Sequence, residues 1–117
     1  MELPLSGLRV LAFQALPPLQ FTCEMLQSQG ACILTVANVK KSGMEQITKN
    51  FFGETEEIAL DLKSEKDRNF LLEHVLPVVD VLLESYRPGV MEKLGLSPQV
   101  IHGINPRVIY ARLSGYG

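Results

Sequence analysis

The chain has 117 residues, which is enough for one domain of ordinary size and too few for two. Hydrophobic residues make up 46% and charged residues 21%, a balance typical of globular proteins and not of disordered ones. Its 11 basic and 13 acidic side chains give a formal net charge of -2, which argues against a nucleic-acid-binding surface. Apolar runs are too short to cross a bilayer and no secretory signal is visible, so we expect a soluble intracellular protein without a membrane partner. The two cysteines, Cys23 and Cys32, indicate neither a disulfide framework nor a metal site.

Five short apolar runs recur along the chain, rich in Val, Ile and Leu and mostly without polar alternation. Such runs are typical of strands that are buried on both faces of a parallel sheet. The runs occupy residues 8–13, 31–36, 58–62, 78–83 and 108–113.

Helical segments fit between these runs. The first is expected to end at Gly30, because glycine commonly terminates helices. Its apolar side is predicted to consist of Phe21, Met25 and Leu26. A shorter helix is expected within residues 88–95, between a proline and a glycine.

Two further helices begin at serine caps. Ser64 stands three residues before Asp67 in the spacing of a capping box, and Pro77 is expected to end that helix. Ser97 caps the last helix, with a proline at its first helical position. The apolar residues of these two helices that we expect to face the core are Leu71, Leu72, Val75, Leu76, Val100, Ile101 and Ile104.

Strands that alternate with helices predict a doubly wound, mostly parallel, Rossmann-like α/β sheet. We expect it to form a single domain over residues 1–117, with an irregular loop at residues 37–57. The chain ends where the loop after the fifth strand would begin, so it is expected to be the first half of a larger domain.

The residues alone give few candidates for chemistry. No glycine-rich phosphate loop follows the first strand, which disfavours nucleotide binding. His74 and His102 are expected on helix surfaces, and Asp61 and Asp80 in structural hydrogen bonds. Arg87 follows a strand and precedes a helix, a place that suits a phosphate or a carboxylate, although a solvent-exposed or ion-paired arginine fits equally well.

Three stretches resemble the α-methylacyl-CoA racemases of the family III CoA-transferases, namely residues 60–64, 79–96 and 105–117. The resemblance implies that the chain is the amino-terminal part of a racemase or CoA-transferase that acts on 2-methylacyl-CoA thioesters. The racemases move the proton next to the thioester carbonyl with a paired His and Asp, and the transferases use an Asp that carries the acyl group. The resemblance also implies dimers with shared sites and, by itself, a peroxisomal or mitochondrial location.

The same resemblance places coenzyme A against particular residues of this chain. Leu60, Asp61, Leu62 and Lys63 match the wall that binds coenzyme A, and Arg87 matches a further contact to it. A polyanionic cofactor prefers cationic and N–H donors, and Lys63 and Arg87 supply the cationic ones.

The catalytic His and Asp of the racemases follow the segment that matches residues 114–117, so we expect no catalytic residue in this chain. The chain is then not catalytic alone and needs a partner, either a second copy or a missing carboxy-terminal half. The turn from Glu54 to Glu57 holds three glutamates where the family has a basic turn. Each is expected to weaken coenzyme A binding by about 1 kcal/mol. A second hypothesis therefore stays open, in which the chain is a degenerate, non-catalytic scaffold or partner-binding domain of the same fold.

Overall fold

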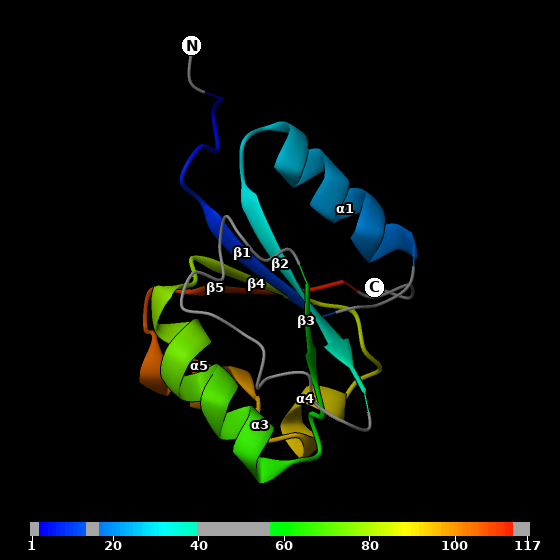
Figure 1. Cartoon of the computed structure of the whole chain (residues 1–117), viewed down its shortest axis with the longest axis vertical. Coiled ribbons are helices and arrows are strands. Elements are labelled where there is room, and N and C mark those ends of the chain that lie inside the picture. The colour runs from blue at the N-terminus through cyan, green and yellow to red at the C-terminus, as the bar shows by residue number, and fades with distance from the viewer. Residues whose placement is uncertain (1–2, 14–16, 40–56, 114–117) are drawn as a thin grey trace.

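The computed structural model describes residues 3–13, 17–39 and 57–113 of the chain. Within these ranges five parallel strands form one sheet in the order β3-β2-β1-β4-β5 (Figure 1). The strands are β1 (Arg9–Phe13), β2 (Cys32–Asn38), β3 (Glu57–Leu60), β4 (Val81–Glu84) and β5 (Ile109–Arg112). All five overlap the predicted runs, and the parallel sheet with its helices confirms the expected α/β fold.

The central strand β1 shows why these runs are apolar throughout. Its side chains alternate between the two faces of the sheet, and both faces are covered. Leu11 and Phe13 join the core cluster on one face, whereas Val10 and Ala12 join a smaller cluster on the other. All four residues are fully buried, so a polar residue at any of these positions would lose its hydration without a partner.

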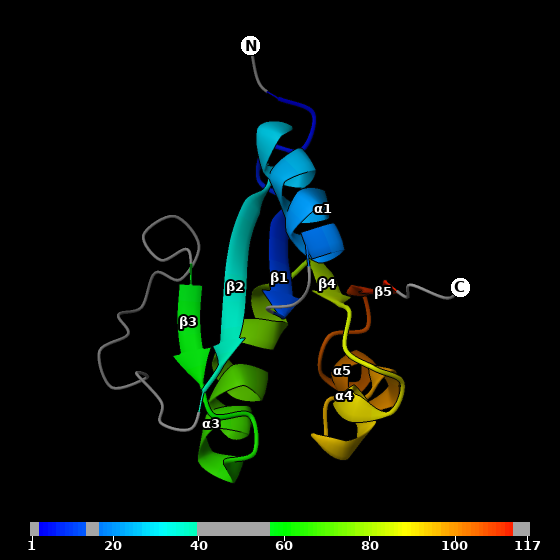
Figure 2. The ribbon, with the colours of Figure 1, turned by 90° about the vertical axis from the view of Figure 1, so that its right-hand side faces the viewer.

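Helices cover both faces of the sheet (Figure 2). Helix α1 (Pro17–Ser28) packs on the smaller cluster. Helices α3 (Glu65–Phe70), α4 (Val90–Lys93) and α5 (Pro98–Ile104) lie on the opposite face, over the larger cluster. The chain builds the sheet outward from β1 to β3 and then crosses to β4 on the other side of β1. The order of the strands therefore reverses between β1 and β4.

The predicted apolar side of the first helix is wrong for Phe21 and Met25 and right for Leu26. Phe21 and Met25 are 63% and 56% exposed, while Leu19, Cys23 and Leu26 pack against the sheet. At about 100° of rotation per residue, positions 19, 23 and 26 share one side of a helix, and positions 21 and 25 share the opposite side. The segment thus carries two apolar stripes, and the sheet buries the one with smaller side chains.

The other helix signals act largely as predicted. The Ser64 Oγ accepts a hydrogen bond from the Asp67 N–H at 3.4 Å, so the serine does cap α3. The Asp67 carboxylate does not return to Ser64 as in a capping box, because it accepts from the Asp61 N–H at 2.7 Å. After Phe70 the helix continues as a π turn (Leu71–Val75) and a 3-10 turn (Leu76–Val78), and Pro77 lies in this last turn.

The predicted core faces of the later helices are only partly right. Leu71, Val75, Leu76 and Ile101 are fully buried, and Leu72 packs against them. Val100 and Ile104 are exposed, because the short helix α5 buries only Ile101 in the core.

Both ends of the predicted irregular loop, residues 37–57, belong to strands. Strand β2 extends to Asn38 and strand β3 begins at Glu57, while residues 40–56 lie outside the described residues. Of the acidic turn from Glu54 to Glu57, only Glu57 is described, as the exposed first residue of β3. In the described ranges, no helix combines the length and the apolar character needed to span a membrane.

Candidate functional site

The carboxyl ends of the five strands meet at one edge of the sheet, because all the strands are parallel. Ligands of open α/β sheets bind beyond this edge, near the point where the strand order reverses. That point lies here between β1 and β4. The predicted cofactor-binding residues lie at the same edge. Leu60 is the last residue of β3, residues 61–63 form the turn after it, and Arg87 follows β4.

Main-chain hydrogen bonds shape the turn after β3. The Leu62 N–H donates to the Asn38 Oδ1 at 3.2 Å, which fastens this turn to the end of β2. The Lys63 N–H donates to the Asp61 Oδ1 at 3.1 Å, so Asp61 has the structural role that the sequence predicts. Asn38, Val39, Asp61 and Lys63 line a hollow of about 450 Å³.

The four predicted residues of this turn divide into two kinds. The side chains of Leu60 and Leu62 are fully buried in the core, where they support the turn. Asp61 and Lys63 line the hollow, and the Lys63 ammonium makes no ion pair with any described residue. The turn therefore presents the Lys63 ammonium to a ligand, while the buried side chains of Leu60 and Leu62 hold the turn against the core.

Arg87 lies at the same edge on the other side of the reversal point. It is exposed, and its guanidinium makes no ion pair within the described part of the chain. Its carbonyl accepts a hydrogen bond from the Val90 N–H at 3.1 Å, and Gly89 begins helix α4 with a φ of 89°. Three strand spacings separate β3 from β4, so the turns that carry Lys63 and Arg87 lie roughly 14 Å apart.

A buried carboxylate holds the loop that carries Arg87. Glu84, the last residue of β4, is 4% exposed, and its Oε2 accepts from the Tyr86 N–H at 2.8 Å. Its Oε1 lies 3.2 Å from the Arg112 Nε, across the register pair between β4 and β5. Burial raises the pKa of Glu84, and the hydrogen bond from Tyr86 and the charge of Arg112 oppose that rise.

Arg112 extends this cluster to helix α4. Its Nη2 donates to the Glu92 Oε2 at 2.6 Å, and this bond lowers the pKa of Glu92. Its guanidinium also lies 5.2 Å from the centre of the Tyr110 ring. Glu84, Arg112 and Glu92 thus join the ends of two strands to α4 and fix both ends of the Arg87 loop. The sequence prediction missed them, although opposite charges within one residue of the ends of two expected strands were a usable signal.

Two buried polar side chains near the reversal point have no hydrogen-bond partner among the residues that the structure describes. The Ser85 Oγ and the Tyr86 hydroxyl are buried and make no hydrogen bond with the described residues. The Tyr86 ring packs on Phe13 at 6.3 Å between centroids, and burial raises the pKa of Tyr86. These groups were not predicted as site residues.

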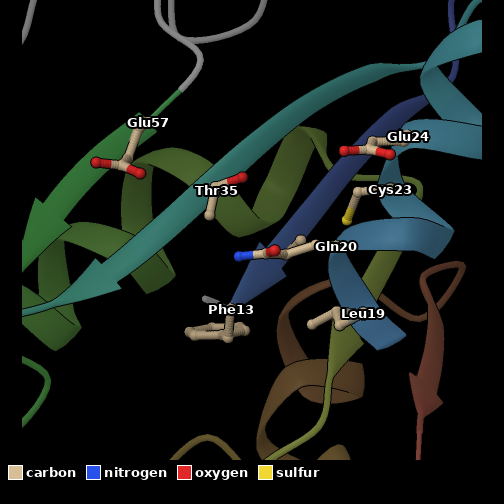
Figure 3. Close-up of a pocket in the computed structure, with 8 residues that line it drawn as sticks. Phe13, Leu19, Gln20, Cys23, Glu24, Thr35 and Glu57 are labelled. Atoms are coloured by element: carbon tan, nitrogen blue, oxygen red, sulfur yellow. The ribbon is translucent and has the colours of Figure 1, made fainter. Parts of the chain in front are cut away.

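A separate cavity of about 240 Å³ lies between α1 and the sheet (Figure 3). Gln20 and Cys23 extend into it from α1, and Ala12 and Thr35 line it on the sheet. Burial, helped by the charge of Glu24, raises the pKa of Cys23, so this thiol stays protonated at neutral pH. The cavity therefore offers no thiolate nucleophile.

No acid/base pair is evident in the described residues. His74 is exposed with its Nε2 4.0 Å from the Glu73 Oε2, and the His102 Nε2 donates to the Val108 carbonyl at 3.0 Å. Both histidines lie on helix surfaces as predicted. Nowhere in the described ranges do three His, Cys, Asp or Glu side chains gather closely enough to hold a metal ion.

Residues 5–117 match the sequence model of the CoA-transferase family III. The chain belongs to CoA-transferase family III. This family III chain is 39% identical to the alpha-methylacyl-CoA racemase of Mus musculus over 114 residues, which are 97% of the chain and 28% of that relative. It is 37% identical to the alpha-methylacyl-CoA racemase of Homo sapiens over 113 residues, which are again 97% of the chain and 28% of that relative. A probable fatty acyl-CoA transferase of Mycobacterium tuberculosis, Rv3272, is 33% identical over 127 residues, covering 97% of the chain and 32% of the relative.

Solved structures share the fold. The crystal structure of Rv3272 in its orthorhombic form superposes with a TM-score of 0.81 at 34% identity, over 98% of the family III chain and 34% of that protein. A CAIB/BAIF family protein from Brucella suis has a TM-score of 0.75 at 22% identity, over 96% of the chain and 33% of that protein. The chain spans about a third or less of the length of these relatives. The predicted family is therefore confirmed, over a segment of the family's full length.

Proposed function

We propose that the chain forms part of an acyl-CoA racemase or CoA-transferase that acts on 2-methylacyl-CoA thioesters. In this proposal its carboxyl edge supplies part of the wall that holds coenzyme A, and the chain is not catalytic alone. The observation that carries the proposal is the position of two cations, Lys63 and Arg87, on either side of the reversal point in a family III sheet, neither of which forms an ion pair with a described residue. Relatives named as racemases and acyl-CoA transferases support the thioester class.

The chemistry of coenzyme A suits this pair. Phosphate oxygens accept strong, charge-assisted hydrogen bonds from an ammonium and a guanidinium, and the guanidinium adds two parallel bonds. The turn with Lys63 is held by Asn38, and the loop with Arg87 by Glu84, so little conformational freedom is lost when a ligand binds. Glu57, the described member of the acidic turn, is the exposed first residue of β3 and lies roughly 10 Å along the strand from Leu60, so solvent and salt largely screen its repulsion of an anionic ligand at the carboxyl edge.

Proton transfer next to a thioester needs an acid and a base that lie close together. The described residues contain no such pair at the carboxyl edge. Asp61 is engaged by the main chain of its own turn, and the two histidines lie on helix surfaces, His74 in the π turn after α3 and His102 in α5. The acid and base are therefore proposed to come from a second copy of the chain or from the part of the fold that the relatives add.

We expect neutralisation of either cation to weaken coenzyme A binding about tenfold, because each charged hydrogen bond contributes roughly 1.5 kcal/mol or more. Titration calorimetry of the full chain should give a dissociation constant near 1 μM, about -8 kcal/mol. Arg87→Gln and Lys63→Gln are the test variants, and Lys66→Gln on the exposed side of α3 is the matched control. No heat with coenzyme A at about 1 mM would contradict the proposal and favour the scaffold hypothesis.

A second experiment tests the catalytic part of the proposal separately. The chain alone is incubated with a 2-methylacyl-CoA in heavy water, and incorporation of deuterium next to the carbonyl is followed by mass spectrometry. We expect incorporation at the rate of the buffer control, since no acid/base pair is present in the described residues. Exchange that depends on the chain would overturn the claim that the chain is not catalytic alone, whatever its affinity for coenzyme A.

A further inference from the structure

A hollow of about 230 Å³ lies at the amino-terminal edge of the sheet, the edge opposite the proposed cofactor wall. Two arginines line it, Arg9 at the start of β1 and Arg107 shortly before β5. Four residue steps along β1 separate Arg9 from the carboxyl edge, roughly 13 Å. A ligand in this hollow would therefore occupy a different site from coenzyme A.

The main chain of Arg9 is fixed by Asp80. The Arg9 N–H donates to the Asp80 Oδ2 at 2.9 Å, and the Asp80 N–H donates to the Arg9 carbonyl at 2.9 Å. The Asp80 carboxylate is therefore engaged with the main chain, and it makes no ion pair with Arg9 among the described residues.

The wall that carries Arg107 is fixed by a buried amide. Asn105 is 8% exposed, and its Oδ1 accepts from the Arg107 N–H at 3.2 Å. Its Nδ2 donates to the carbonyls of Leu76 and Val79 at 3.0 and 2.7 Å, which fastens the 3-10 turn on the other side of the hollow. One side chain thus holds both walls in place.

The two guanidinium groups have no anionic partner in the part of the chain that the structure describes. Among the described residues that line the hollow, Asp80 carries the single carboxylate, so the two arginines give this described lining a net positive charge. Pro77 and Val78 add an apolar side. A guanidinium fork matches the oxygens of a phosphate group, and two forks on a preformed wall can bind it from two directions. At roughly 30 Å³ for one water molecule, the hollow has room for such an ion.

We propose that this hollow is a phosphate-binding site, in which Arg9 and Arg107 hold the oxygens of inorganic phosphate or of an organic phosphate ester. The proposal is independent of coenzyme A binding, because it involves no residue of the carboxyl edge. Asp80 sets a limit on its strength, since its carboxylate repels an incoming anion and favours a weak, exchangeable ligand.

The test follows the arginine Nε–H signals of the ¹⁵N-labelled full chain by NMR during titration with sodium phosphate at constant ionic strength. We expect the signals of Arg9 and Arg107 to shift along a saturating curve, with a dissociation constant of about 1 mM. Either Arg9→Gln or Arg107→Gln should weaken binding at least about fivefold, whereas Lys66→Gln on α3 should leave it unchanged. A parallel titration with phenyl phosphate separates the sources, since tighter binding than phosphate indicates an ester that also contacts Pro77 and Val78.

Three results would overturn the proposal. They are shifts that rise linearly without saturation, shifts of equal size on all arginines, and unchanged affinity in the Arg107→Gln variant. Arg107 lies in a turn outside the sheet, so its variant decides the question even if Arg9→Gln lowers the stability of the fold.

Discussion

Replacement of Arg112 by glutamine is expected to lower the free energy of unfolding by about 3 kcal/mol at pH 7.5, because the Glu84 carboxylate then stays buried without its ion-pair partner. We choose the low end of the range for broken buried pairs, since the Arg112 side chain is itself 39% exposed. Urea unfolding of the wild type and the variant measures the difference.

The stability lost in Arg112→Gln should become smaller as the pH falls, because of how Glu84 and Glu92 ionise. Burial already raises the pKa of Glu84, and removal of Arg112 takes away a charge that opposes this rise. A carboxyl with a raised pKa in the folded state favours folding more as the pH falls, so the variant regains stability toward pH 5. Arg112 also lowers the pKa of Glu92 in the wild type, and that contribution is present at neutral pH and lost in acid. Both effects reduce the difference in the free energy of unfolding between the wild type and the variant as the pH falls.

The control is Lys93→Gln, which removes an exposed charge from the same helix α4 and should change stability by less than about 0.5 kcal/mol. Glu84→Gln keeps an acceptor for the Tyr86 N–H and should cost less than Arg112→Gln, because no buried charge is left alone. A deficit in Arg112→Gln that is the same at pH 5 and pH 7.5 would show that the ion pair is not its cause.

The features that could be predicted from the sequence depend on neighbouring residues. The parallel strands are buried on both faces, so each appears as an unbroken apolar run such as the one that holds Val10 and Leu11. Ser64 and Ser97 cap helices through bonds to residues three positions ahead, a distance that a local pattern contains. These signals give the order of the elements, and the parallel order then places residues 60–63 and Arg87 at one edge.

The features that were missed depend on contacts between distant residues. Helix α1 has apolar residues on two sides, and only the packing of the sheet decides that Leu19 is buried and Phe21 exposed. Glu84 and Arg112 form a pair only because the register of β4 and β5 sets them side by side. Arg9 and Arg107 lie at one hollow because β1 is two strands away from β5 in the sheet, which their positions in the chain do not reveal. The residues assigned to coenzyme A came from the family resemblance, since Lys63 and Arg87 look like ordinary surface cations in a local pattern.

Asn105→Ala is expected to lower the free energy of unfolding by about 3 kcal/mol, as much as the loss of Arg112, although no charge is involved. The amide makes three hydrogen bonds from a position that is 8% exposed. Its removal leaves the Arg107 N–H and the carbonyl of Val79, a residue that is 2% exposed, without this partner, and a polar group left unsatisfied costs roughly 1–3 kcal/mol. The Leu76 carbonyl loses less, because it also accepts from the Val79 N–H. Urea unfolding at pH 7 measures the effect.

Asn105→Asp tests whether the donors of the amide are the cause. The side chain keeps its shape and an acceptor for the Arg107 N–H, but a carboxylate would face the carbonyls of Leu76 and Val79 without a proton to donate. We expect this variant to be no more stable than Asn105→Ala at pH 7 and to recover part of the loss as the pH falls and the new carboxyl group gains a proton. Asn69→Asp on the exposed surface of α3 is the matched control and should show neither effect beyond about 0.5 kcal/mol. If Asn105→Asp matched the wild type at pH 7, the two donated bonds could not be what holds the 3-10 turn, and the rigid wall proposed for the phosphate hollow would lose its support.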